Sequence, residues 1–230
     1  MNATKMEWST ISKKRAVSDE QKKERREKIL GEALKLYEKF SYKSVSISDI
    51  AKNSGVAKGT VFLYFKTKEE LFAYLTMQQI DKWFNVLDFE LERLKKGRKK
   101  NSKDQIIKIH KKLIESHPVL LRLFAILNTT IEQNISENVA LEFKERVAGR
   151  LFQAGNHLEG CLSFLKTGGG SKLILKIYAL IIGFQHLSDP APVFSRVIKK
   201  KQMEIFTIDF SDWFLETLED LLIGLESKST

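Results

Sequence analysis

The side chains best able to bind a polyanion are concentrated near the start of this 230-residue sequence. Residues 1–68 contain 16 Lys and Arg against 8 Asp and Glu, whereas residues 69–230 contain 23 against 21. Hydroxyl and amino side chains recur through residues 46–68, where they can donate hydrogen bonds to phosphate oxygens and to base edges. No basic amphipathic helix with exposed aromatic residues accompanies them, so nucleic acid is favoured over a membrane surface.

Other reactive residue types form no catalytic or metal-binding pattern. The four histidines, at positions 110, 117, 157 and 186, lack metal-ligand spacing, and no nucleophile motif or Gly-rich cofactor loop appears. We therefore expect no enzymatic activity, no cofactor and no metal site. The single Cys161 suits a reducing compartment. No signal peptide or apolar run long enough to cross a bilayer is present, so we expect a cytoplasmic protein with no membrane partner.

Two short helices with a tight turn between them must position the side chains of residues 46–68. Ser46 followed by Asp49 has the form of a capping box, which starts the first helix. Gly55 can take the positive φ that ends it, and a second helix is predicted from Ala57 to about Tyr64. This arrangement is a helix-turn-helix, whose second helix enters the major groove of DNA.

Over about 45 residues (roughly 26–72) the sequence resembles the DNA-binding domain of the TetR family of bacterial transcriptional regulators. The resemblance is carried by the inward stripe of the preceding helix and by short motifs in register: Ile29, Ala33, Leu36, Tyr37 and Phe40, then Asp49-Ile50-Ala51, Gly55-Val56, Lys58-Gly59-Thr60, Tyr64-Phe65 and Lys68-Glu69-Glu70-Leu71. It implies a sequence-specific transcriptional regulator, usually a repressor, that binds a near-palindromic operator as a homodimer.

The resemblance also implies roles for individual residues of the helix-turn-helix. Base-edge contacts are implied for Ser48, Lys58, Gly59, Thr60, Phe62 and Leu63, and phosphate contacts for Ser46, Tyr64 and Lys68. Lysine can donate to guanine O6 and N7, and threonine and phenylalanine can meet thymine methyl groups. Two positions depart from the family pattern. Ala57 stands where a capping Ser or Thr is common, and Leu63 stands where a polar residue is common.

Helical periodicity predicts an all-α fold of about nine helices. A flexible basic arm over residues 1–17 precedes a helix-turn-helix domain over 18–66, and a larger helical domain spans 67–230. The later helices are predicted at about 67–96, 104–116, 118–128, through Phe143 and Phe152, 171–187 and 206–225. Gly168-Gly169-Gly170 is interpreted as a flexible linker, and the Lys-rich segment 95–103 as a solvated loop. Whether the arm touches DNA stays open.

In TetR relatives the larger domain holds a small molecule in an apolar cavity. Candidate lining residues here are Trp83, Phe84, Ile107, His110, Phe124, Leu127, Phe152, His157 and Phe184, with His110 or His157 as polar anchors. We therefore expect the effector to be a small molecule with a bulky apolar body. The alternative is that these residues are ordinary core and that the larger domain docks another protein instead.

The last two long helices carry more apolar surface than one protomer needs to form its core. In relatives the corresponding helices of two subunits form a four-helix dimer interface. The resemblance therefore implies a homodimer, with candidate interface residues Leu173, Ile177, Leu180, Ile181, Phe210, Trp213, Phe214 and Leu221.

Overall fold

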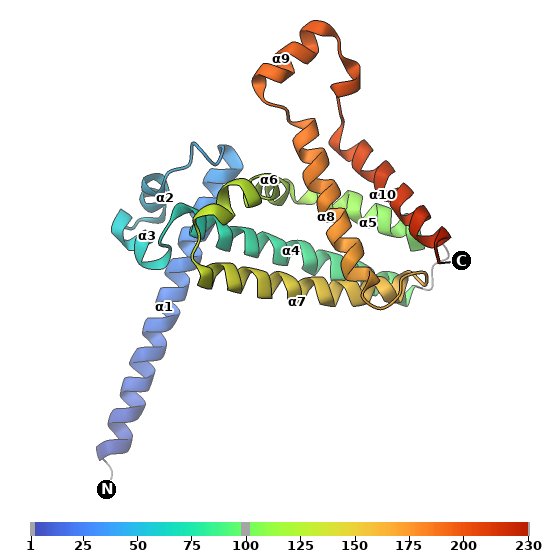
Figure 1. Ribbon diagram of the computed structural model, residues 1–230. Helices are drawn as coiled ribbons and strands as arrows, with labels where there is room; N and C mark the ends of the chain where they lie inside the picture. Colours follow the sequence, from blue (N-terminus) through green and yellow to red (C-terminus); the bar gives the residue numbers. More distant parts are fainter. Residues whose placement is uncertain (1–2, 98–101, 230) are drawn as a thin grey trace. The chain divides into compact units, whose positions relative to one another are not determined.

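The computed structural model describes the backbone of residues 3–97 and 102–229, and the side chains from residue 19 onward (Figure 1). All elements in these ranges are helical, which confirms the all-α prediction. The ten α-helices are α1 (Ala3–Lys39), α2 (Ile47–Ser54), α3 (Lys58–Tyr64), α4 (Lys68–Lys96), α5 (Ser102–Ser116), α6 (Pro118–Ile126), α7 (Glu137–Cys161), α8 (Gly169–Ser188), α9 (Pro192–Lys201) and α10 (Phe210–Ser227).

The chain divides into two compact units, and α4 belongs to both. Residues 1–75 form the first unit and residues 76–230 the second. The core of the first unit contains Ile29, Leu30, Ala33, Tyr37, Ile50, Val61, Phe65, Leu71 and Phe72. These positions repeat at helical spacing, so the apolar stripes of the four helices meet in one core. Phe40, which the sequence placed on the inward stripe, is half exposed.

The first helix is longer than the sequence indicated. It begins at Ala3, whereas we predicted a flexible arm through residue 17 and a helix from Ser18. Residues 3–39 contain no proline, and their single glycine, Gly31, lies well inside the helix, so no residue in this stretch ends it. Residues 1–2 of the predicted arm lie outside the described part of the chain, as do residues 98–101 of the Lys-rich segment.

In the second unit, α7 runs alongside α4, α8 packs on α7 and α6, and α10 packs on α8 and α5 (Figure 1). The break between α5 and α6 falls where the sequence predicted it. Pro118 occupies the first turn of α6, where its missing N–H costs no helical hydrogen bond. A π-helical turn, Leu127–Ile131, and a 3₁₀ turn, Glu132–Asn134, then connect α6 to α7.

The glycine run before α8 is not simply a linker. Gly168 has a φ of 79° and caps α8, whereas Gly169 and Gly170 lie inside that helix. A Cβ atom at Gly170 would lie 2.6 Å from the carbonyl carbon of Gly155 in α7, and closer still to its oxygen. The hydroxyl of Ser171 donates to the carbonyl of Leu151 at 3.0 Å. Gly155 and Gly170 therefore let α7 and α8 cross with their backbones almost in contact.

The helix that sequence reasoning missed is α9. The sequence predicted no helix between those at 171–187 and 206–225, a stretch that contains two prolines and a lysine run. In the structure Pro192 occupies the first turn of α9 and Lys199 to Lys201 its last turn, which are favourable places for these residue types. The helix ends at Gln202, which has a φ of 51°. In Figure 1, α9 projects away from the other helices of its unit.

Within the described residues, no helix has both the length and the apolar composition that a membrane span requires.

Candidate DNA-binding surface and effector cavity

The start of α2 is held by the cap that the sequence predicted. The backbone N–H of Asp49 donates to the hydroxyl of Ser46 at 3.1 Å. The hydroxyl of Ser46 in turn donates to the carboxylate of Asp49 at 2.5 Å, a contact that the capping-box pattern did not specify. The hydroxyl of Ser46 is thus engaged both as acceptor and as donor within the helix start, and a phosphate contact by Ser46 would compete with that arrangement.

The turn between α2 and α3 depends on Gly55. Its φ of 69° and ψ of 33° lie in the left-handed region, and its N–H reaches the carbonyl groups of Ala51 and Lys52. The N–H of Val56 donates to the carbonyl of Ala51 at 3.0 Å, which completes the turn. Ala57 then precedes α3 without a side-chain cap, as its residue type requires.

Helix α3 has one buried and one exposed face. Val61 is fully buried, and so is Phe65 just after the helix. These two side chains anchor the helix to the core of its unit. Away from this buried face Lys58 and Gly59 are exposed, and Leu63 is 84% exposed. An exposed leucine gains nothing from burial within the protomer, so its side chain is available to a partner.

The remaining predicted DNA contacts divide into two groups. Ser48 and Phe62 are exposed, and Thr60 and Tyr64 are partly exposed, so all four side chains can reach a ligand. Lys68 is different: its ammonium donates to the carbonyl of Tyr42 and lies 3.9 Å from the centre of the Tyr42 ring. Burial lowers the pKa of Lys68, although the nearby carboxylate of Glu69 opposes that shift.

Tyr42 joins the loop before α2 to the first turn of α4. Its hydroxyl donates to the carboxylate of Glu69 at 2.6 Å, and its ring packs edge-on against Phe72 with centres 4.8 Å apart. Burial, reinforced by the hydrogen bond to Glu69, raises the pKa of this phenol. The N–H of Glu70 donates to the hydroxyl of Thr67 at 3.0 Å, which caps the same turn. The start of α4 is therefore fixed to the helix-turn-helix.

The second unit contains an apolar cavity of about 540 Å³. Its walls come from α4 to α8 and from the π-helical turn. The lining residues are Ile80, Trp83, Phe84, Leu87, His110, Leu120, Phe124, Leu127, Asn128, Glu132, Phe143, Lys144, Val147, Ala148, Leu151, Ile174, Leu175, Ile177, Tyr178 and Ile181. This volume and this apolar character are typical of sites that bind small molecules.

Five of the nine predicted lining residues face this cavity: Trp83, Phe84, His110, Phe124 and Leu127. The other four do not. Phe152 is 68% exposed, and Ile107 is partly exposed and is not among the lining residues. Phe184 contacts the ring of Trp213, with centres 6.2 Å apart, and Nδ1 of His157 lies 3.0 Å from the carboxylate of Asp88. The sequence gives the type of each of these residues and its helical spacing, but not which neighbour its side chain contacts.

His110 is the buried polar group of the cavity. Its side chain is 1% exposed, and its Nδ1 lies 2.8 Å from the carbonyl oxygen of Ile106. Burial lowers the pKa of His110 to about 4, so the imidazole is uncharged at neutral pH. Because a carbonyl can only accept, Nδ1 carries the proton and Nε2 keeps a free lone pair. His110 thus offers a hydrogen-bond acceptor to the cavity.

Sequence reasoning missed the polar residues at the edge of the cavity. Asn128 lies within the widened backbone of the π-helical turn and Glu132 follows it directly, and periodicity gives no signal for such a turn. The ammonium of Lys144 donates to the carboxylate of Glu132 at 2.9 Å. The ring of Tyr178 packs edge-on against Phe124, with centres 4.9 Å apart. Burial, and to a lesser extent Glu132, raises the pKa of Tyr178 to about 12, so its hydroxyl is also neutral.

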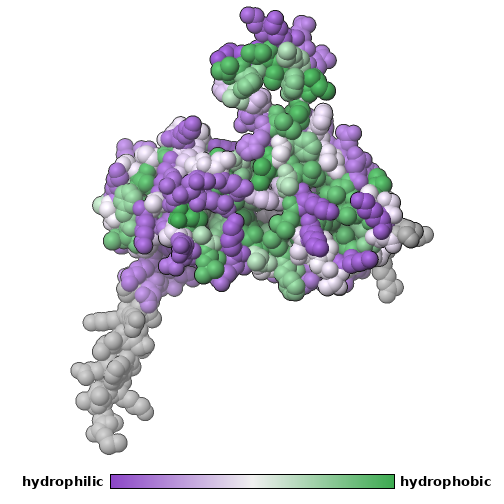
Figure 2. Space-filling model, in the orientation of Figure 1, coloured by the Kyte–Doolittle hydropathy of each residue, from purple (hydrophilic) through white to green (hydrophobic). Residues whose placement is uncertain are grey.

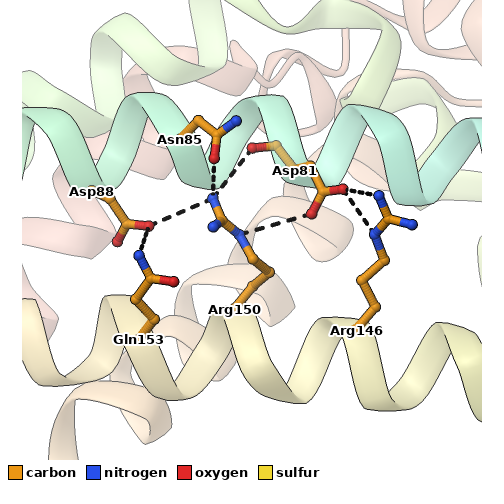
Figure 3. Close-up of polar contacts among 6 residues, drawn as sticks. All are labelled: Asp81, Asn85, Asp88, Arg146, Arg150 and Gln153. Carbon is orange, nitrogen blue, oxygen red and sulfur yellow. Dashed lines mark hydrogen bonds and ion pairs between the residues drawn. The ribbon is translucent and has the colours of Figure 1, made fainter.

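A polar network joins α4 to α7 beside the cavity (Figure 3). Arg150 of α7 donates to Asn85 at 2.6 Å, and the same nitrogen lies 3.5 Å from Asp88. Arg146 donates from Nε to Asp81 at 2.8 Å, and Gln153 donates to Asp88 at 3.1 Å. The two helices are therefore held in register by charged and amide groups rather than by apolar packing alone.

The eight predicted dimer-interface residues do not share one environment. Leu173, Ile177, Ile181 and Phe214 are buried inside the protomer, and Ile177 and Ile181 line the cavity. Burial in the protomer removes these four from a subunit contact. For Leu173, Ile177 and Ile181 the sequence does not show this, because α8 is apolar on nearly every face, and Phe214 lies on the inward face of α10. Leu180, Phe210 and Leu221 are partly exposed, and Trp213 is exposed. These four stay candidates for a subunit contact.

Comparison with known proteins identifies both units. The family described as "Bacterial regulatory proteins, tetR family" matches residues 29–75, and the family "Tetracyclin repressor-like, C-terminal domain" matches residues 77–229. The second match includes nearly all of the second compact unit, and the first match includes residues 29–75 of the first unit.

Two curated relatives match part of the chain. The uncharacterized HTH-type transcriptional regulator YhgD of Bacillus subtilis is 43% identical over 49 residues, which are 21% of this chain and 26% of that protein. The HTH-type transcriptional regulator QacR of Staphylococcus aureus is 35% identical over 75 residues, or 33% of this chain and 40% of that protein. The matched stretches thus span well under half of either relative.

The fold is shared with solved structures over most of the chain. The crystal structure of a TetR-family transcriptional regulator from Streptomyces coelicolor has a TM-score of 0.54 at 16% sequence identity. The match covers 90% of this chain and 82% of that one. At this identity the likeness establishes a common fold and no more.

Proposed function

The chain belongs to the TetR family of DNA-binding transcriptional regulators, and from this premise we propose that it is a homodimeric repressor released from its operator by a small, mainly apolar effector. The family consists of regulators rather than enzymes. The observation that carries the effector part of the proposal is the cavity of about 540 Å³, whose wall includes several residues of α4.

The surface of α3 supports sequence-specific DNA binding. Lys58 and Leu63 are exposed and Thr60 is partly exposed, whereas Val61 is buried, so these three side chains can enter a major groove while the core stays intact. Lys58 can donate to guanine, and the apolar Leu63 suits contact with a thymine methyl group rather than a hydrogen bond. A single short helix makes few contacts, so two copies about 34–36 Å apart are needed to read a near-palindromic site.

Uncovered apolar surface on the second unit supports a homodimer. Large apolar side chains are exposed along α8, α9 and α10 and the segment between the last two: Leu187, Val193, Phe194, Val197, Met203, Ile205, Phe206, Trp213 and Ile223. Figure 2 shows that apolar surface covers much of the projecting α9 segment. A second copy of this chain would bury these residues.

The charges beside this surface are complementary between two copies. Arg196 and residues 199–201 make α9 basic, whereas α10 exposes Asp212, Glu216, Glu219 and Asp220. The basic α9 of one subunit therefore fits the acidic α10 of its partner. Sedimentation analysis tests this: Phe194→Ser with Val197→Ser should raise the dimer dissociation constant, whereas Lys172→Ser, an exposed control on α8, should not. An unchanged dissociation constant in the double variant would exclude α9 from the interface.

Helix α4 supports a route from the cavity to DNA. Ile80, Trp83 and Phe84 of α4 line the cavity, and residues 68–75 of the same helix belong to the unit that contains α2 and α3. Suppose that α4 takes one position in the DNA-binding form and another in the released form. A ligand that binds the released form more tightly then shifts the equilibrium toward that form, to an extent set by the ratio of its two affinities. This coupling is what release by an effector requires.

The alternative function is a regulator whose larger domain docks another protein and binds no small molecule. A small or absent cavity would have favoured it, and the cavity of about 540 Å³ favours the sensor instead. Native mass spectrometry of protein purified from its own host should show an increase in mass caused by a retained apolar ligand. Footprinting on the DNA beside the protein's own gene should show protection that this ligand reverses. Protection that no bound ligand or host extract reverses would overturn the effector proposal and leave the DNA-binding function standing.

A further inference from the structure

The polar groups of the cavity restrict the chemistry of the effector more than the apolar walls do. Of the polar lining residues, Asn128 is exposed, Lys144 is largely exposed and paired with Glu132, and Tyr178 is partly exposed. Only His110 is almost completely buried among the polar residues that line the cavity. His110 therefore provides the buried hydrogen-bond acceptor for a deeply bound ligand.

We propose that the effector is an uncharged amphiphile whose apolar body fills the cavity and whose hydroxyl group donates a hydrogen bond to Nε2 of His110. The proposal rests on the proposed function, because it names the ligand class of the same cavity. It follows from the bond between Nδ1 of His110 and the carbonyl of Ile106, which leaves Nε2 as an acceptor.

A carboxylate head does not meet this requirement. It has no proton to donate, so its oxygens would face the lone pair of Nε2 across a site without a buried cation. Lys144, the one lysine or arginine among the residues that line the cavity, already bonds to Glu132 at 2.9 Å. An acidic amphiphile could only place its head at the edge of the cavity, beside that ion pair.

A cationic head is disfavoured deep in the cavity for a second reason. Burial keeps the imidazole of His110 itself uncharged at neutral pH, and the same loss of water would act against an ammonium group placed beside it. A hydroxyl group can donate a hydrogen bond to Nε2 without bringing a charge into the site. An alcohol or a phenol therefore matches the buried chemistry better than an acid or an amine.

Isothermal titration calorimetry on the full-length protein tests this with four matched probes: decan-1-ol, 1-methoxynonane, decanoate and decylammonium. The ether has the length of the alcohol but no donor. We expect the alcohol to bind about tenfold more tightly than the ether, since one hydrogen bond to a buried acceptor separates them. We expect decanoate and decylammonium to bind more weakly than the alcohol.

A pair of variants identifies the acceptor. His110→Phe removes Nε2, so the preference for alcohol over ether should fall from about tenfold to near onefold. A change in cavity shape affects both probes alike and cancels in this ratio. His117→Phe is the matched control, because its Nδ1 likewise lies near a backbone carbonyl, that of Leu113 at 3.1 Å, but His117 does not line the cavity. The tenfold preference should survive in that variant.

The possible failures are distinguishable. If none of the four probes binds, the cavity does not take small amphiphiles, and the sensor part of the proposed function fails together with this inference. If the probes bind but the ether equals the alcohol, or decanoate or decylammonium binds best, the sensor survives and this inference alone fails. If the alcohol preference persists in His110→Phe and is lost in Tyr178→Phe, the acceptor is Tyr178 and the assignment to His110 is wrong. The probe series on the unmodified protein decides the ligand class even if a variant does not fold.

Discussion

The guanidinium carbon of Arg150 lies 5.5 Å from the centre of the Phe84 ring. Phe84 lines the cavity, and Arg150 is the central residue of the polar network between α4 and α7 (Figure 3). One arginine therefore contacts both the site of the proposed effector and the groups that hold α4 in register. A ligand that displaces the Phe84 ring would disturb the bonds from Arg150 to Asn85 and Asp88.

We expect Arg150→Met to destabilise the second unit by about 2 kcal/mol, because the variant keeps the apolar stem but removes hydrogen bonds to charged and amide groups. Arg146→Met is the matched control. The Arg146 side chain is 43% exposed against 18% for Arg150, so its ion pair should contribute less than about 1 kcal/mol. Urea unfolding followed by circular dichroism measures both. Equal losses would show that the network does not depend on Arg150.

Gly170→Ala should destabilise the protein by about 1–3 kcal/mol, because the new methyl group would overlap the backbone of Gly155 and force α7 and α8 apart. Gly183→Ala, in the same helix, has no atom within 4 Å of the new methyl group. That change should instead stabilise by about 0.5–1 kcal/mol through helix propensity. Thermal unfolding compares the two. Similar effects of both substitutions would disprove the close crossing.

Lys58→Ala should weaken operator binding by about 1–3 kcal/mol and relax the preference at one base pair of each half-site. The side chain is exposed on α3, so the free energy of unfolding should be unchanged. Fluorescence anisotropy with the operator and with single-base variants measures the preference. A loss that is uniform across all sequences would show that Lys58 contacts phosphate rather than a base.

Lys68→Ala should weaken binding to all DNA sequences about equally and reduce the slope of affinity against salt concentration by about 1. The structure adds a second expectation. Because the ammonium of Lys68 also donates to the carbonyl of Tyr42, the variant should lower the stability of the first unit. Binding should therefore be measured well below the unfolding temperature. A changed base preference would contradict the assignment of Lys68 to phosphate.

The buried His110 should make stability fall as the pH falls from about 6.5 to 4. In the unfolded chain its pKa returns to about 6.5, whereas burial lowers it to about 4 in the folded protein. Between these values the unfolded state binds more protons, so lowering the pH favours unfolding. The full difference corresponds to about 3 kcal/mol below pH 4. Urea unfolding at several pH values should show a shallower decline in His110→Phe, and an identical decline would contradict a neutral buried imidazole.

Local features of the fold could be predicted from the sequence because they depend on neighbouring residues. Ser46 caps α2, Gly55 ends it with a positive φ, and Pro118 starts α6, each through a backbone preference that acts within one turn. The charge excess of the first 68 residues and the motifs around Lys58 indicate DNA binding on their own. These predictions need no knowledge of which segments meet in space.

The tertiary structure alone decided which apolar residues line the cavity and which face a partner. Along α8 nearly every position is apolar, so periodicity could not show that Ile177 and Ile181 turn inward while Leu187 stays exposed. The glycines at 155 and 170 acquire their role only because α7 and α8 cross there. His110 becomes an uncharged acceptor only through burial by residues distant in sequence. Packing and desolvation depend on contacts between remote segments, whereas capping and turn formation depend on residues a few positions apart.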